Sequence, residues 1–267
     1  MIREAASVIL LRRAPGGPNG FEIFFVRRHR GSSFMASAYV FPGGAAEEGE
    51  DARTAAAREL FEEAGVLLAR DRGDTADTMQ VPVVAKLRQR ILGGVPAQAA
   101  LAAAGLAWST DMLVPWSHWI TPSVEKKRFS ARFFVTELPA GQEPHFDATE
   151  VVDQAWVTPA DAIARAAELM LPPPQVRTCW ELAQWNSIEA VLAAGRSRAE
   201  EPHPIMPRLM PGERPCLLLP WDAEYMQATG DSAAMAYRPR WATGPSRFVL
   251  EDRAWKHVDG PGSTSAG

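Results

Sequence analysis

Short runs of β-branched and aromatic residues alternate along the chain with longer stretches of helical periodicity. The strand-like runs cover residues 6–12, 22–28, 127–138 and 150–157. Runs of this kind between turn-forming residues are typical of strands. The turn signal Pro-Gly-Gly-Pro-Asn-Gly at residues 15–20 separates the first two runs and predicts a loop, and therefore a hairpin.

The helical stretches have apolar residues three or four positions apart. In residues 51–64, Ala52, Ala56, Leu60 and Ala64 share one side of a predicted helix, and Gly65 is expected to end it. Further helices are predicted at residues 81–92, 96–104, 159–169, 176–185 and 187–194. Because strands and helices are mixed along the chain, the predicted fold class is α/β.

Interruptions of this pattern indicate how the chain is divided. The helices at about residues 81–105 are expected to form an insertion that caps the core. The sequence Leu-Pro-Pro-Pro-Gln at residues 171–175 predicts a boundary, with a main domain at residues 1–170 and a C-terminal extension at residues 171–267. The extension is expected to be helical and then irregular, with short strands near residues 214–220 and 246–251, and to pack on the domain or on a second subunit.

Composition restricts the class of protein. Hydrophobic residues make up 46% of the 267 positions and charged residues 22%, with a net charge of -4. These values are typical of a globular protein and argue against broad binding to nucleic acid or anionic lipid. Neither a membrane span nor a signal peptide is recognisable, and Cys179 and Cys216 are expected to be buried, reduced thiols. We therefore expect a cytoplasmic protein with a small partner.

The predicted helix at residues 51–64 has an acidic face. Glu59, Glu62 and Glu63 fall within an arc of about 100°. Like charges at these spacings cost about 0.2–0.5 kcal/mol each on a bare helix, so a cation is expected beside them. A donor set of carboxylate oxygens favours Mg²⁺ or Mn²⁺. The alternative is a solvated face with salt bridges, such as one from Arg58 to Glu62.

The segment that contains this helix resembles a known family motif. Residues 44–66, GAAEEGEDARTAAARELFEEAGV, match the Nudix box, GX5EX7REUXEEXGU, at every position. The resemblance implies a Nudix α/β/α sandwich with a mixed sheet. It also implies a metal-dependent hydrolase that cleaves a diphosphate linking a nucleoside to another group.

The resemblance also suggests roles for the acidic residues. Glu59 and Glu63 are the expected metal ligands, while Glu62 either completes a second metal site or takes the proton from the attacking water. Glu150, beside a late strand, is nominated as a further ligand because other Nudix enzymes have a glutamate there. The alternative for Glu150 is an exposed residue that flanks an edge strand.

Other residues of the motif are expected to support the carboxylates. Arg58 should orient the cluster by pairing with Glu50 or Glu62, because its guanidinium can hold two carboxylates in a fixed geometry. Gly43 and Gly44 should shape a loop whose backbone approaches the metal or the phosphate.

Three segments outside the box resemble the Nudix branch that includes the peroxisomal coenzyme A diphosphatase. They are residues 33–44, 119–134 and 218–225. Coenzyme A or an acyl derivative is therefore the first substrate expected, with ADP-ribose, NADH or a damaged nucleoside triphosphate as alternatives. A non-catalytic, nucleotide-sensing Nudix module is the alternative of another class, which the intact box and the lack of a helix-turn-helix motif disfavour. The last residues are not Ser-Lys-Leu, so no peroxisomal address is expected.

Basic and aromatic residues offer candidate substrate contacts. Arg27, with the basic residues at 28 and 29, ends one predicted strand, and the basic residues at 126–128 begin another. Either group could bind phosphate, and solvated strand ends are the alternative. Three aromatic residues could stack on an adenine or belong to the core, namely Phe34, Trp116 and Trp119. The sequence also leaves a homodimer open.

Overall fold

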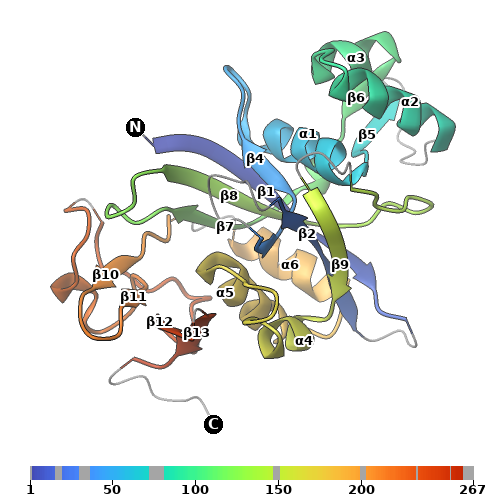
Figure 1. Ribbon diagram of the computed structural model, residues 1–267. Coiled ribbons are helices and arrows are strands. Elements are labelled where there is room, and N and C mark those ends of the chain that lie inside the picture. Colours follow the sequence, from blue (N-terminus) through green and yellow to red (C-terminus); the bar gives the residue numbers. More distant parts are fainter. Residues whose placement is uncertain are drawn as a thin grey trace.

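The computed structural model describes residues 2–15, 20–29, 37–71, 81–146, 151–198, 203–232, 234–252 and 254–260. A seven-stranded mixed sheet forms the centre of the molecule. Its strands are β1 (Ile2–Arg13), β2 (Phe21–Arg28), β3 (Tyr39–Val40), β4 (Gly43–Ala45), β7 (Val114–Ile120), β8 (Arg128–Glu137) and β9 (Val151–Val157). Figure 1 shows α1 on one side of this sheet and α4, α5 and α6 on the other.

Strand β1 lies in the middle of the sheet. It pairs in parallel with β8 along one edge, and antiparallel with β2 and β4 along the other. The antiparallel pairing of Leu11 with Ile23 confirms the predicted hairpin. Strand β9 extends the sheet beside β2, and β7 extends it beside β8.

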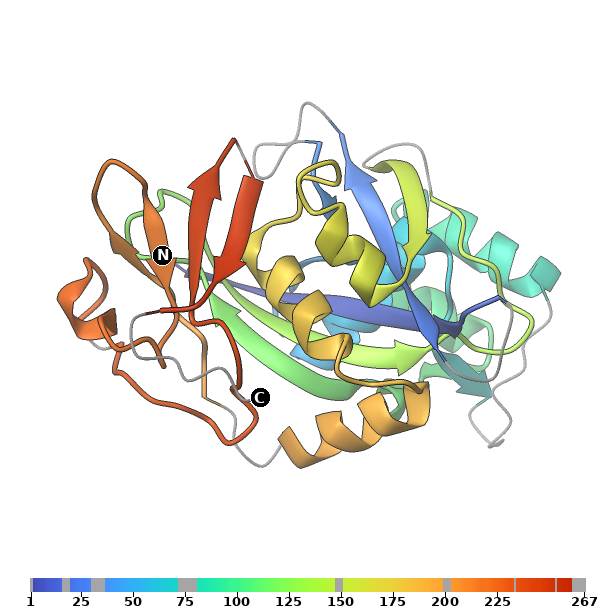
Figure 2. The ribbon, with the colours of Figure 1, turned by 90° about the horizontal axis from the view of Figure 1, so that it is seen from below.

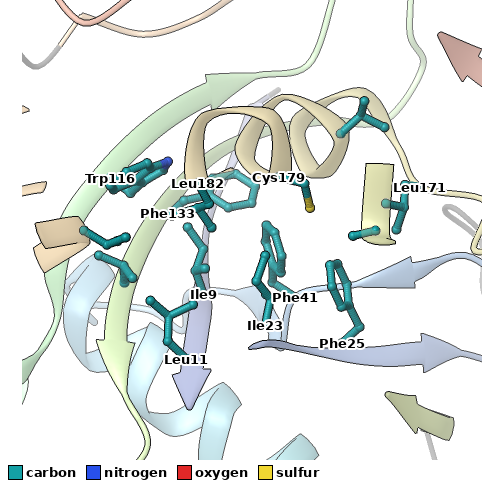
Figure 3. Packing of buried hydrophobic residues seen from close by; sticks show 14 of the residues in the cluster. Ile9, Leu11, Ile23, Phe25, Phe41, Trp116, Phe133, Leu171, Cys179 and Leu182 are labelled. Atoms are coloured by element: carbon teal, nitrogen blue, oxygen red, sulfur yellow. The ribbon is translucent and has the colours of Figure 1, made fainter. Parts of the chain in front are cut away.

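The side chains of β1 alternate between two hydrophobic clusters. Val8 and Leu10 belong to the cluster that includes the apolar side of α1. Ile9 and Leu11 belong to the cluster that includes residues of α5 and α6, part of which Figure 3 shows. Because both faces of the sheet are covered, β1 appears in the sequence as a continuous apolar run. The predicted α/β/α layering is confirmed.

The helices are α1 (Ala52–Ala64), α2 (Val81–Leu92), α3 (Ala97–Ala103), α4 (Pro159–Ala164), α5 (Pro173–Leu182) and α6 (Ile188–Arg198). Helix α1 begins after Asp51, whose side chain accepts hydrogen bonds from the backbone N–H groups of Arg53 and Thr54. It ends at Gly65, which has a left-handed conformation with φ of 69°. These two local signals confirm the predicted helix.

Helices α2 and α3 confirm the two helices predicted for the insertion, and the name insertion is kept for them below; a two-stranded sheet of β5 (Ala69–Asp71) and β6 (Leu106–Trp108) flanks them. Phe61 of α1 packs in one cluster with Leu87 and Leu101 of the insertion. The insertion therefore lies against α1, at one end of the molecule (Figure 1), and its role as a cap over the core stays a prediction. The short helix η1 (Thr110–Met112) follows it.

Residues 203–260, which were expected to be mainly irregular, contain four strands and a short helix in the described part of the chain. A four-stranded antiparallel sheet consists of β10 (Arg208–Met210), β11 (Cys216–Leu218), β12 (Arg247–Glu251) and β13 (Ala254–Val258), and η2 (Tyr225–Gln227) lies between β11 and β12. The two short strands predicted here, now β11 and β12, are confirmed. The prediction missed β10, which lies between Pro207 and Pro211, and β13, in which Lys256 and His257 interrupt the apolar pattern.

Helices α5 and α6 pack directly on the sheet. Leu171, Cys179 and Leu182 share a hydrophobic cluster with Ile9 and Phe25 of the central strands (Figure 3). Figure 2, seen from below, shows α4, α5 and α6 in front of the sheet. The core thus continues across the boundary expected near residue 170, and the division into a domain and an extension stays a prediction.

Several element boundaries differ from those predicted. Helix α5 begins at Pro173 rather than at residue 176, because proline is well tolerated in the first turn. Helix α4 ends at Ala164, five residues before the predicted end at residue 169. Two short strands, β3 and β4, lie in what was expected to be a loop, and β7 was not predicted. In the described part of the chain, no helix combines the length and apolar composition that crossing a bilayer requires.

Candidate active site

Two successive glycines of β4 face two glutamates of α1. The backbone N–H of Gly43 donates to Glu63 Oε2 at 2.9 Å. A Cβ on Gly44 would lie 2.5 Å from Glu59 Oε1, so the carboxylate occupies the space that a side chain would take. Strand β4 is held there by its antiparallel pairing with β1. The glycines therefore let α1 bring both carboxylates against the backbone, while the approach of this backbone to a metal or a phosphate stays a prediction.

A buried guanidinium joins three carboxylates beside these glycines. Arg58 donates from Nε to Glu50 Oε1 at 3.0 Å and from Nη2 to Glu50 Oε2 at 3.0 Å. Its Nη1 donates to Glu59 Oε1 at 2.9 Å and to Glu62 Oε2 at 3.2 Å. Nη2 also donates to the carbonyl of Ala45 in β4, at 2.9 Å. Arg58 therefore pairs with both of the partners proposed for it, Glu50 and Glu62, and also with Glu59.

The charges of this cluster stabilise one another. Burial alone would lower the pKa of Arg58, but the hydrogen bonds and charges of Glu50 and Glu59 outweigh it and raise that pKa. Burial raises the pKa of the Glu62 carboxyl, and the nearby Arg58 partly offsets the rise. The side chain of Glu62 is 27% exposed, against 14% for Glu59. Glu62 is thus the more accessible of these two carboxylates.

The oxygen atoms of the glutamates in this cluster are the kind of ligand that a hard divalent cation prefers. Glu50, Glu59, Glu62 and Glu63 offer only carboxylate oxygens, and four carboxylates exceed the single charge of Arg58. Among the described residues, however, no three carboxylate, imidazole or thiol groups converge as in a ready-made metal site. A cation would therefore compete with Arg58 for the carboxylates that it holds. The fourth nominated ligand, Glu150, lies outside the described residues.

Arg27, the candidate substrate contact, lies across the sheet from α1. Phe25, two residues earlier in β2, points into the cluster on the α5 side. Arg27 follows the same alternation, and its guanidinium carbon lies 5.8 Å from the ring centroid of Tyr39. The Tyr39 hydroxyl donates to Asp153 Oδ2 at 2.7 Å. Arg27 thus belongs to a polar group at the β2–β3–β9 edge, and its contact with substrate stays a prediction.

The other candidate contacts divide between core and surface. Trp116 and Trp119 are 2% and 4% exposed, so the interpretation as core residues is right and stacking on a ligand is wrong for both. Arg128 donates to the carbonyl of Thr121 at 3.0 Å, which fixes the turn before β8. Phe34 lies outside the described residues.

Both cysteines are buried and free, as predicted.

One contact of helix α1 was not predicted from the sequence. Arg88 of α2 reaches the C-terminal end of α1 and donates to the backbone carbonyl of Glu62 at 2.7 Å. Arg88 and Glu62 are 26 residues apart. The sequence of α2 does not indicate this contact, because the contact depends on how α2 packs against α1.

Comparisons with known proteins agree with this geometry. A model of the NUDT19 Nudix domain matches residues 50–182, and a model of the NUDIX domain matches residues 1–83. The crystal structure of a NUDIX hydrolase from Alicyclobacillus acidocaldarius superposes with a TM-score of 0.63 and 27% identity, covering 72% of this chain and 96% of that chain.

Curated relatives belong to the same group. A nudix hydrolase of Caenorhabditis elegans is 30% identical over 199 residues, which cover 70% of this chain and 63% of that protein. This chain therefore spans less than two thirds of that relative's length. The acyl-coenzyme A diphosphatase NUDT19 of Gallus gallus is 28% identical over 275 residues, covering 74% of this chain and 72% of that protein. The motif, the layers around it and these matches together show that the chain belongs to the Nudix hydrolase family.

Proposed function

We propose that this protein is a metal-dependent pyrophosphohydrolase that cleaves the diphosphate of coenzyme A or of an acyl-coenzyme A. The observation that supports this most is the carboxylate cluster, in which Arg58 holds Glu50, Glu59 and Glu62 beside the two glycines of β4. Such an excess of carboxylates around one buried cation is destabilising unless a second cation offsets it, because like charges repel at short distance. A divalent metal ion would supply that charge, and the same ion would neutralise the diphosphate during hydrolysis.

The charged residues of α1 have different proposed roles. Glu59 and Glu63 would hold Mg²⁺ or Mn²⁺, which supplies charge neutralisation for the diphosphate and lowers the pKa of water. Glu62 would accept the proton from the attacking water, since it is the more accessible carboxylate and burial raises its pKa. Arg58 would fix the directions of Glu59 and Glu62 without touching substrate.

Support for the substrate comes from the relatives. The protein of Gallus gallus that is 28% identical to this chain is named an acyl-coenzyme A diphosphatase. The proposal extends that substrate class to this chain. ADP-ribose, NADH and damaged nucleoside triphosphates differ from it in the group attached to the diphosphate, so direct comparison separates them. The cytoplasmic location, the homodimer and the ligand role of Glu150 stay predictions.

Product analysis tests the proposal. The purified protein is incubated with coenzyme A, acetyl-coenzyme A, ADP-ribose, NADH and 8-oxo-dGTP, each with Mg²⁺, with Mn²⁺ and with chelator. Release of 3′,5′-ADP from coenzyme A only when metal is present is the expected result. Cleavage of another compound alone would keep the reaction and refute the substrate. Turnover of none of them would favour the non-catalytic, nucleotide-sensing module.

A matched pair of variants tests the role of Glu62. Glu62→Gln keeps the size of the side chain but removes its ability to accept a proton, so kcat should fall by about 10²-fold or more. Glu125→Gln, in an exposed turn, is the control and should leave kcat unchanged. Normal turnover by the Glu62 variant would show that another group is the base.

A further inference from the structure

A second arginine holds the main chain of Glu62. Arg88, in helix α2 of the insertion, donates from Nη2 and Nε to the backbone carbonyl of Glu62 at 2.7 and 3.3 Å. Its Nη1 donates to the backbone carbonyl of His145 at 2.7 Å. Glu62 is therefore held twice by guanidinium groups, by Arg58 at its carboxylate and by Arg88 at its carbonyl.

The carbonyl of Glu62 is one of the last four of α1, which have no partner inside the helix. The dipole of a helix concentrates partial negative charge at this end, so a cation is stabilising there. No basic residue of α1 itself lies in its last turn. Arg88 supplies that charge from another helix.

Gly65 makes room for this contact. A Cβ at Gly65 would lie 2.9 Å from Arg88 Nη1 and 3.3 Å from Arg88 Cζ. The glycine thus has two uses, since it adopts the left-handed φ of 69° that ends α1 and it lets the guanidinium pass close to the backbone.

The segment after β8 holds the same end of α1 from another side. The backbone N–H of His145 donates to the carbonyl of Ala64 at 2.8 Å. The side-chain amide of Gln142 pairs with both the N–H and the carbonyl of Leu67, at 2.8 and 2.9 Å. Because Arg88 bonds to His145 as well as to Glu62, it joins these contacts to the insertion.

We propose that Arg88 is a positioning residue, through which the insertion sets the last turn of α1 and with it the Glu62 and Glu63 carboxylates. This inference rests on the proposed function for its effect on catalysis, but not for its effect on the helix end. A displacement of about 1 Å at a reacting group can cost 10²-fold in rate, so a small shift of this turn is sufficient.

Two variants of Arg88 and one control test the proposal in the full-length protein. Arg88→Met keeps the stem but removes all its hydrogen bonds, and Arg88→Lys keeps the charge but loses the planar fork. Arg90→Met, on the exposed side of the same helix, is the matched control. Hydrogen–deuterium exchange of the peptide at residues 61–68, thermal unfolding, kcat, KM and the Mg²⁺ concentration for half-maximal activity are measured well below the melting temperature.

We expect Arg88→Met to speed exchange at residues 61–68 by about tenfold and to lower kcat per folded molecule by about 10- to 100-fold. KM should change little, while the Mg²⁺ requirement rises. Arg88→Lys should lie between this variant and the wild type, and Arg90→Met should match the wild type. If Arg88→Met does not fold, the same comparison with Arg88→Lys decides the question.

The outcomes separate this inference from the proposed function. Unchanged exchange at residues 61–68 in both Arg88 variants would overturn the inference, whatever the enzyme hydrolyses. Faster exchange with unchanged kcat and Mg²⁺ dependence would reduce Arg88 to a purely structural role and would also overturn it. If the wild type hydrolyses none of the compounds, the proposed function fails, and exchange with Mg²⁺ binding to the wild type and variants still tests the positioning role.

Discussion

The backbone N–H of Gly43 donates a 2.9 Å hydrogen bond to the carboxylate of Glu63. The two residues belong to different elements, β4 and α1, and the contact forms because β4 pairs with β1 under the helix. The next residue, Gly44, lies against the carboxylate of Glu59, which occupies the space where a Cβ on Gly44 would be. A side chain at Gly44 would meet the flexible carboxylate of Glu59, whereas one at Gly43 would meet the backbone of β1, so substitutions at the two glycines should have different effects.

A methyl group at Gly44 should affect activity more than stability. In Gly44→Ala the added Cβ would lie 2.5 Å from Glu59 Oε1, and the carboxylate at the end of a flexible side chain must move away. We expect kcat to fall by about 10- to 100-fold, with a change in unfolding free energy below about 1 kcal/mol. Steady-state kinetics and urea unfolding measure the two effects.

Gly43→Ala is the comparison and should lower stability more than Gly44→Ala does. Its Cβ would lie 2.4 Å from the backbone oxygen of Ala6 and 2.6 Å from Ser7 Cα, so the pairing of β4 with β1 must open. A loss of about 1–3 kcal/mol in unfolding free energy is expected. Equal losses of stability in the two variants would contradict this account of the loop.

Arg58 should be required for folding as well as for orientation. Arg58→Met would leave the half-buried carboxylates of Glu50 and Glu59 without their cation, at an expected cost of about 3 kcal/mol. Added Mg²⁺ should raise the melting temperature of this variant more than that of the wild type, because the cation can replace the lost charge. Arg70→Met, which breaks an exposed pair with Asp111, serves as the control and should cost less than about 1 kcal/mol.

The unfolding free energy should decrease at low pH because of His118. Burial, followed by the charge of Arg132, lowers the pKa of His118 to about 4, whereas the unfolded value is about 6.5. Between these values the unfolded chain binds a proton that the folded protein does not, so the unfolding free energy decreases as the pH falls from about 6.5 to 4. The expected loss is about 1 kcal/mol after allowance for partial exposure.

Urea unfolding at pH 7, 5 and 4 measures this dependence. His118→Gln removes the titrating group and keeps a polar partner for Ser130, whose hydroxyl lies 2.9 Å from His118 Nε2. The variant should lose less stability than the wild type over the same range. Parallel curves for the two proteins would refute the assignment.

Glu181 should be essential for attaching residues 203–260 to the core. Its carboxylate is buried between Arg177, at 2.6 Å, and Arg198, at 2.5 Å. The guanidinium of Arg198 in turn stacks on Trp116 of β7 and on Trp241, with distances of 3.8 and 4.5 Å to the ring centroids. The ion pairs and the stacked rings therefore connect α5, α6, the sheet and the C-terminal part of the chain.

Glu181→Gln tests this connection. The neutral amide would leave two buried guanidinium groups without a counter-charge, and the expected loss is about 3–5 kcal/mol in unfolding free energy. Glu168→Gln is a suitable control, because it breaks the exposed pair of Glu168 with Arg165 and should change stability by less than about 1 kcal/mol. A similar, small effect of both substitutions would show that the buried pairs contribute little.

Local sequence signals determined the acidic helix α1. Asp51 and Gly65 mark its two ends, and the spacing of the glutamates places them on one face, so α1 and its acidic side were predictable without any tertiary contact. The central strand β1 was predictable for a similar reason, because burial on both faces requires a continuous apolar run. Strand β7 was missed, since Pro115, Ser117 and His118 interrupt its apolar pattern and only pairing with β8 makes it a strand.

Tertiary structure alone decided which distant residues contact helix α1. The sequence suggested Arg58 as the partner of Glu50 or Glu62, because these residues are close along one helix and its preceding loop. It gave no indication of Arg88, which is 26 residues from Glu62, nor that Arg27 points to the face of the sheet opposite α1. Periodicity and capping specify a helix over a few turns, whereas contacts between distant segments depend on how complete elements pack, and that packing is a property of the whole core.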